Sequence, residues 1–326
     1  MRIRGLLFLF AVVAMLSWPA EARAQNERYA VIVQGTSGGE PFAGTYRKWV
    51  TSLAGILRDK FGFDATRVTV LTDQPQAGEQ IANAETVKTT FAKLASQAKD
   101  GDLVFVLLIG HGGGDGAEAK FNLVGPDMTV LEWSAMLAPM KGRLAFVDTT
   151  GGSFPFLKGL SAPGRVVITA TGSPAQRYDT VFPDAFIQAL TATVADGDKN
   201  GRISLLEAFL YASSLVKQNY EQRGHLATEN AVFNDTGDGS AQNSAAPGAA
   251  AGTVAGLTYL DVVTSPKSSD PAVQQLLVRQ QQLTEQIDEL RRRRPSMTPE
   301  VFDQEFEKLI VDLALVSRDV RRRSGG

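Results

Sequence analysis

An uninterrupted apolar run, Leu103 to Ile109, limits the folds open to this chain more than any other feature. A strand with one face in water alternates apolar and polar residues, so this run must be covered on both faces. Related runs occur at 29–33, 68–71, 144–147 and 166–169, and segments with helical periodicity lie between them. Strands that alternate with helices predict a largely parallel sheet between two helical layers, an α/β fold.

The composition changes after residue 233. Residues 234–269 are rich in Ala, Gly, Ser and Asn and predict a linker or irregular segment. Residues 270–323 carry two amphipathic helical patterns, the second beginning at Thr298-Pro299. They predict an antiparallel helical hairpin of the coiled-coil type. Two arginine runs, 291–294 and 321–323, fall at the C-terminal ends of its helices, where cations are favoured; contact with a partner or an anionic surface is the alternative.

The first 24 residues have the organisation of a secretory signal peptide. Arg2 and Arg4 precede an apolar stretch, 6–16, that is too short to span a bilayer, and 22–24 offers small residues for cleavage. No later stretch is long and apolar enough to cross a membrane. We therefore expect an exported protein, periplasmic or secreted, with no transmembrane helix after cleavage.

Charge and cysteine content exclude several functions. The chain has 33 Lys and Arg against 35 Asp and Glu, so no basic surplus favours nucleic-acid binding. It has no cysteine, hence neither disulfides nor a thiol nucleophile. Its two histidines, His111 and His225, lack partners at zinc spacing, and a surface or capping role is expected for His225.

A glycine-rich segment containing His111 directly follows the long apolar run: residues 109–115 read IGHGGGD. In open α/β sheets functional groups collect at the carboxyl ends of the strands. An imidazole on an accessible loop there could act as a general acid or base. A turn that merely contains a histidine is the alternative interpretation.

Several segments together resemble the caspase-like and legumain-type cysteine peptidases over about residues 28–230. They are the apolar strand at 29–33, Tyr46-Arg47, the strand leading into His111-Gly112, FVDTTGGSF at 146–154 and ITAT at 168–171. The resemblance implies a caspase-like three-layer sandwich for residues 25–233. It also implies a peptide-binding cleft between the His111 loop, the 148–153 loop and the segment after Thr171.

In that family a histidine pairs with a cysteine nucleophile, and here the cysteine position falls on Thr150, two residues after Asp148. A hydroxyl is far less acidic than a thiol and needs a strong base held by an orienting group. His111 is the candidate base and Asp148 the candidate orienting residue. The resemblance therefore favours a non-catalytic pseudo-peptidase that binds peptides or proteins through the cleft or the helical hairpin. A hydrolase using Thr150 or Ser153 with His111, and a purely structural envelope protein, are the alternatives.

Residues 196–207, DGDKNGRISLLE, match the twelve-residue calcium loop of EF-hands. Gly201 stands where the loop turns sharply. The predicted oxygen ligands are Asp196, Asp198, Asn200, the carbonyl of Arg202, Ser204 through a water, and Glu207 with both carboxylate oxygens. An acidic surface turn before a helix capped by Ser204 is the alternative. Residues 234–239 look like half of such a loop but lack the closing acid, so a polar turn is expected there.

Overall fold

The computed structural model describes residues 26–40, 42–246, 249–262, 268–294 and 297–324. The predicted signal peptide, residues 1–24, lies outside the described residues. Seven strands form the main sheet: β1 Arg28–Gln34, β2 Val68–Thr72, β3 Gln80–Ile81, β4 Leu103–Ile109, β8 Arg143–Asp148, β9 Val166–Thr169 and β10 Val232–Asn234. Their spatial order is β10-β9-β8-β4-β1-β2-β3. Every neighbouring pair is parallel except β9 and β10.

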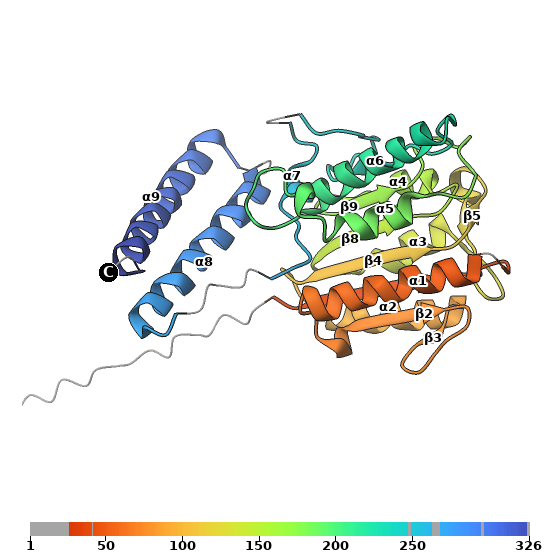
Figure 1. Cartoon of the computed structure of the whole chain (residues 1–326), viewed down its shortest axis with the longest axis horizontal. Coiled ribbons are helices and arrows are strands. Elements are labelled where there is room, and N and C mark those ends of the chain that lie inside the picture. Colours follow the sequence, from red (N-terminus) through yellow and green to blue (C-terminus); the bar gives the residue numbers. More distant parts are fainter. Residues whose placement is uncertain (1–25, 41, 247–248, 263–267, 295–296, 325–326) are drawn as a thin grey trace, which may run out of the picture.

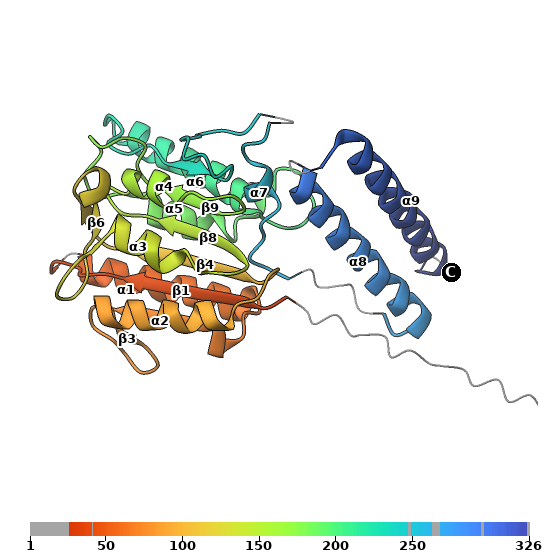
Figure 2. The same cartoon turned by 180° about the vertical axis from the view of Figure 1, so that it is seen from behind.

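Helices cover both faces of this sheet (Figures 1 and 2). One face carries α1 Phe42–Gly55, α5 Phe182–Ala189 and α6 Leu205–Gln222. The other carries α2 Ala84–Gln97, α3 Val130–Leu137 and α4 Phe154–Leu160. The prediction of an α/β sandwich with a mostly parallel sheet is therefore confirmed.

Strand β4 lies at the centre, as its apolar run predicts. All of its residues are buried. Phe105, Leu107 and Ile109 enter the core beneath α1, α5 and α6. Val104 and Leu108 enter the opposite core, beneath α2, α3 and α4. Because side chains alternate across a strand, a strand covered on both sides has to be apolar throughout.

Polar side chains set where the helices begin. Thr129 accepts a bond from the backbone N–H of Glu132 at 3.3 Å, and the Glu132 carboxylate accepts one from the N–H of Thr129 at 2.9 Å. This reciprocal cap fixes the start of α3 at Val130. Helix α5 ends at Ala189, and a separate turn follows at Thr193–Ala195.

Short elements complete the described part of the sandwich. A three-stranded sheet beside the His111 loop consists of β5 Gly112–Gly113, β6 Lys120–Phe121 and β7 Met128–Thr129. One turn of π-helix follows α1 at Ile56–Lys60, and 3₁₀ turns occur at Ala65–Arg67, Gly116–Glu118 and Thr193–Ala195.

The segment 234–269, predicted as a linker or irregular, packs on the sandwich over much of its described length. It contains one short helix, α7 Thr253–Gly256, whose N–H groups at Gly252 and Ala255 donate to the buried Asp235 carboxylate, each at 2.9 Å. Leu260 is buried in the same core as α6. The half-loop at 234–239 is a self-bonded polar turn, in which Asp238 accepts from the N–H of Ser240 at 2.9 Å.

The predicted helical hairpin is confirmed as α8 Pro271–Arg293 and α9 Pro299–Ser324 (Figure 1). The two helices run antiparallel, and α8 lies nearer the sandwich, next to α7. Phe302 stacks on Phe306 within α9, and the Gln280 side chain donates to the Ser317 hydroxyl at 2.9 Å between the helices. Among the described residues, none of the helices has the length and apolar character needed to cross a membrane.

Candidate functional site

The residues singled out near the sheet collect at its carboxyl edge. Strands β4 and β8 are direct neighbours, and His111 and Thr150 each lie two residues beyond the last residue of one of them. Their loops touch, because a Cβ added to Gly112 would lie 2.8 Å from the Thr150 hydroxyl oxygen. The structure therefore brings the His111 loop and the Thr150 loop together, as a parallel sheet requires.

His111 is held by a set of oxygens from other loops. Its Nε2 lies 3.2 Å from the Tyr46 hydroxyl and 3.2 Å from the Ser37 carbonyl oxygen. Its Nδ1 lies 3.3 Å from a carboxylate oxygen of Asp179. The Phe42 ring packs edge-on against the imidazole at 4.8 Å. Both ring nitrogens thus face fixed polar atoms from α1 and from the loops after β1 and β9.

Tyr46 belongs to this cluster, and its surroundings shift the pKa of its hydroxyl. Burial, and secondarily the negative charge of Asp179, raise the pKa of its hydroxyl above the ordinary value. The neutral phenol is therefore the form that faces His111 near neutral pH. Tyr46 also stacks on Trp49 at 5.5 Å, which continues the aromatic surface along α1.

Thr150 does not face His111. Its hydroxyl donates to Asp148 Oδ1 at 2.8 Å, and its backbone N–H donates to the same oxygen at 3.0 Å. The Thr150 side chain is only 1% exposed. In the part of the chain that the structure describes, no hydrogen bond links it to the imidazole.

Asp148 is the most perturbed carboxyl group at this edge. Complete burial raises its pKa to about 7, while the two bonds from Thr150 act in the opposite direction. Its second oxygen, Oδ2, has no partner among the described residues. Asp148 was predicted to orient His111; it binds Thr150 instead, and the carboxylate beside His111 is that of Asp179.

The segment after Thr171 closes over the Thr150 loop. Thr180 donates to the Thr149 carbonyl at 2.6 Å, and the N–H of Gly152 donates to the Gln176 carbonyl at 2.9 Å. A Cβ on Gly151 would lie 2.2 Å from the Tyr178 carbonyl oxygen, so the two backbones are in close contact. This cover explains why Thr150 is shielded from solvent.

Ser153, the other candidate nucleophile, is also buried and bonded. Its hydroxyl lies 3.0 Å from the hydroxyl of Thr171 and accepts a bond from the Thr171 backbone N–H at 3.2 Å. Neither predicted hydroxyl is therefore presented to a substrate or to the imidazole.

Two hollows flank α1. The larger, of about 500 Å³, lies beside His111 between α1, α5 and α6. Tyr46, Trp49, Asp179 and Asp184 are among its lining residues, and Trp49 donates its indole N–H to Asp184 at 2.9 Å. The hollow thus combines aromatic surface with carboxylates.

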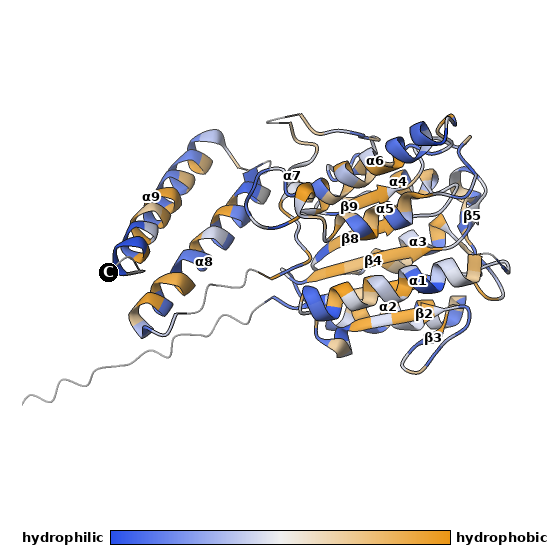
Figure 3. Cartoon of the chain, viewed as in Figure 1, coloured by the Kyte–Doolittle hydropathy of each residue, from blue (hydrophilic) through white to orange (hydrophobic). Residues whose placement is uncertain are grey.

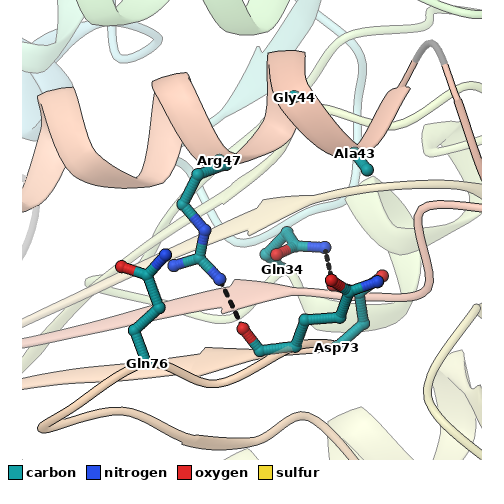
Figure 4. Close-up of a pocket in the computed structure, with 7 residues that line it drawn as sticks. Gln34, Ala43, Gly44, Arg47, Asp73 and Gln76 are labelled. Carbon is teal, nitrogen blue, oxygen red and sulfur yellow. Dashed lines mark hydrogen bonds between the residues drawn. The ribbon is translucent and has the colours of Figure 1, made fainter.

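The smaller hollow, of about 250 Å³, lies on the other side of α1, above the ends of β1 and β2 (Figure 4). Arg47 binds both carboxylate oxygens of Glu79 at 2.7 and 2.8 Å. Asp73 accepts from the Gln34 amide at 2.8 Å and from the Ser37 N–H at 2.9 Å. The charged groups of this hollow are thus bound within the protein: Arg47 is paired with Glu79, and Asp73 is hydrogen-bonded to neutral donors.

The loop at 196–207 forms a second cluster, on the surface. Carboxylate oxygens of Asp196, Asp198 and Glu207 lie within 4.8 Å of one another. Lys199, at φ 59°, and Gly201, at φ 82°, both take left-handed backbone conformations that curl the chain around these oxygens. Three carboxylates converging on one point favour a hard cation, so the residues fit calcium.

The other predicted ligands of this loop also form contacts with other protein groups. Asn200 donates its amide to Asp198 at 2.9 Å and to the Tyr259 hydroxyl at 3.1 Å. Ser204 caps α6 through its bond from the N–H of Glu207 at 3.2 Å. The Arg202 side chain points away from the carboxylates and binds Asp261 at 2.7 Å, which leaves only its backbone carbonyl for an ion.

A strap formed by residues 258–261 holds this loop from outside. Besides the Arg202–Asp261 ion pair, the Arg202 guanidinium lies 3.9 Å over the Tyr259 ring, and Ser204 forms an antiparallel bridge with Tyr259. The N–H of Leu205 donates to the Thr258 carbonyl at 2.9 Å. Helix α7, which immediately precedes the strap, contacts α8 of the hairpin.

Sequence reasoning missed Asp179, Ser37 and Phe42 around the imidazole, and it missed the strap. No local pattern marks these residues, because they reach their partners only through the tertiary fold.

Comparison with known proteins gives little. No family model matches the chain, and no curated protein matches it. Among solved structures, the crystal structure of protein GSU0716 from Geobacter sulfurreducens is similar, at 13% identity and a TM-score of 0.42. The match covers 64% of this chain and 92% of that one.

Proposed function

We propose that this is an exported, calcium-binding pseudo-peptidase of the caspase/legumain type, periplasmic or secreted, that acts as a non-catalytic scaffold for a peptide or protein partner. The observation that carries the proposal is the state of Thr150. By the sequence resemblance, Thr150 stands where the family has its nucleophile, and its hydroxyl is buried and donates to Asp148.

The chemistry of a hydroxyl nucleophile supports the proposal that the protein is non-catalytic. A threonine hydroxyl attacks an amide only when a base removes its proton. Here the proton of Thr150 points to Asp148, and the imidazole of His111 faces Tyr46, Ser37 and Asp179. The backbone of Tyr178 lies against Gly151 and blocks the approach of a substrate.

Peptide binding does not need an accessible nucleophile, so it remains chemically reasonable for this protein. The hollow beside His111 offers the Tyr46 and Trp49 rings next to the carboxylates of Asp179 and Asp184. Aromatic faces and carboxylates together favour apolar or cationic side chains of a peptide. We propose this hollow as the peptide-binding part of the scaffold, with the helical hairpin as a second binding surface.

Calcium has a structural role in this proposal. Asp196, Asp198 and Glu207 would supply carboxylate oxygens, with Asn200, the Arg202 carbonyl and Ser204 completing the set. The ion would neutralise three mutually repelling carboxylates and fix the start of α6.

One arrangement favours the hydrolase alternative: the Asp179–His111 pair has the form of an orienting acid and a base. Activity would then require residues 176–180 to move away and Thr150 to leave Asp148.

A covalent probe distinguishes the pseudo-peptidase from the hydrolase. The protein is incubated with electrophilic peptide probes, including a fluorophosphonate and an epoxyketone, and intact mass is measured for wild type, Thr150→Ala and His111→Ala. We expect no adduct in any of them. An adduct that forms on wild type and disappears in both variants would establish the hydrolase.

A further inference from the structure

We infer that the exposed face of α9 binds a second copy of this chain, α9 against α9 in antiparallel orientation, to give a two-fold symmetric dimer. The inference rests on the proposed function only in taking the hairpin as a binding surface. The assays below do not depend on the cleft or on calcium, so the two proposals can fail separately.

The middle of this face is apolar and uncovered. Ile310 is 39% exposed, Val311 50% and Leu315 45%, and Ala314 is exposed beside them. These residues follow one another at helical spacing, on the side of α9 turned away from the buried Phe302. Figure 3 shows apolar residues along the middle of α9 and hydrophilic ones at its C-terminal end.

The two ends of the same face carry opposite charges. Glu300, Asp303 and Glu307 are exposed on the N-terminal side of the apolar patch, and none has an ion-pair partner among the described residues. Arg318 and Arg322 are exposed on the C-terminal side, with exposed side-chain fractions of 63% and 71%. Both arginines contact Asp319 on their own helix, at 3.3 and 3.5 Å, which neutralises them only in part.

This pattern is self-complementary under one symmetry operation. A two-fold axis midway between Asp312 and Leu313 places each residue opposite one equally distant on the other side of that point. The facing pairs are then Ile310 with Leu315, Val311 with Ala314, Glu307 with Arg318, and Asp303 with Arg322.

Each of these pairs occurs twice in the dimer. The apolar patch covers itself, and every acidic residue of the pairing meets an arginine. A parallel arrangement would instead set acidic ends against acidic ends and arginines against arginines, which disfavours it. Charge complementarity therefore selects a second copy, and the antiparallel orientation, from the possible occupants of this face.

Light scattering after size exclusion tests the dimer, with the chain from Gln25 onward at about 100 µM. We expect twice the mass of one chain. Glu307→Arg or Arg318→Glu should each weaken the dimer at least about tenfold, because like charges then face each other twice. The double variant Glu307→Arg/Arg318→Glu should restore the affinity, and Lys93→Glu, an exposed charge reversal on α2, should leave it unchanged. A monomeric wild type, or no restoration in the double variant, would overturn the inference.

Cross-linking tests the orientation. Because the chain has no native cysteine, only the introduced thiols can react. Ala314→Cys lies near the proposed axis and should cross-link efficiently with a short bis-maleimide. Gln304→Cys faces its own copy only in a parallel dimer; in the antiparallel one the two thiols are about 26 Å apart at 1.5 Å per residue. Cross-linking of Gln304→Cys as efficient as that of Ala314→Cys would reject the antiparallel dimer. Leu226→Cys, 91% exposed on the sandwich, controls for random collision.

Discussion

The turn at Asp148–Thr150 and the loop at 196–207 both place carboxylates close to polar donors. The turn is buried in the protein interior, whereas the loop lies at the surface. Asp148 is fully buried, and Thr150 supplies both of its hydrogen bonds. The carboxylates of Asp196, Asp198 and Glu207 converge at the surface. Every carboxylate oxygen of the surface loop accepts a hydrogen bond within the loop, and these side chains remain partly exposed, so a cation can still reach them. Asp148 Oδ2, in contrast, has neither a partner among the described residues nor contact with water, which penalises the charged form. The same residue type therefore lies in an incompletely bonded buried turn in one place and in an accessible, internally bonded cluster in the other.

The largest expected effect tests the burial of Asp148. Its pKa rises from the ordinary 3.8 to about 7, so between these values the folded state binds a proton that the unfolded state has lost. Stability should therefore fall as pH rises from about 4 to about 7, by up to about 4 kcal/mol at about 1.4 kcal/mol per pKa unit. Asp148→Asn removes this loss. Urea unfolding at several pH values measures the difference between variant and wild type.

The matched control is Asp100→Asn, which changes an exposed carboxylate and should keep the wild-type pH dependence. Comparison with wild type cancels the contributions of other carboxyl groups, such as Glu229, whose pKa burial also raises. If Asp148→Asn and wild type lose the same stability over this range, Asp148 is not the desolvated group that the structure describes.

The next effect tests the surface loop. Calcium at about one hundred times its dissociation constant should stabilise the fold by about 2.7 kcal/mol. For a chain of this size that raises Tm by about 4 °C. Asp196→Ala should abolish both the shift and the heat of binding in titration calorimetry, while Asp100→Asn keeps them. Magnesium should act more weakly, because it tolerates this flexible oxygen geometry poorly. Equal calcium heats from wild type and Asp196→Ala would remove the calcium claim.

These two regions also differ in how far the sequence could predict them. The loop at 196–207 is local: its carboxylates lie within twelve consecutive positions, so spacing alone identified the three that converge. Strand β4 was predictable for a similar reason, since continuous apolarity requires cover on both faces.

The carboxyl edge is not local, and prediction there was only partial. The positions of His111 and Thr150 followed from the strand ends, but their partners did not. Asp179 reaches the imidazole from the loop after β9, and the burial of Thr150 depends on backbone contacts with Tyr178. Such contacts depend on the path of a loop over the sheet, which no periodicity or spacing encodes.

The smallest effect concerns the strap that borders the surface loop. Arg202 and Asp261 are partly buried, with exposed side-chain fractions of 20% and 24%, and the guanidinium meets both carboxylate oxygens. A double-mutant cycle with Arg202→Met and Asp261→Asn should give a coupling energy on the order of 1 kcal/mol in urea unfolding. A coupling near zero would show that the pair is only a surface contact.

The same cycle, run with calcium and again with a chelator, asks whether the ion acts beyond its own loop. An ion that orders residues 196–207 fixes the backbone of Arg202, so its side chain loses less freedom on meeting Asp261. The coupling energy should therefore be larger with calcium. Equal coupling in both conditions would mean that the strap holds the loop whatever its ligand, and that calcium has no influence on the segment leading to the hairpin.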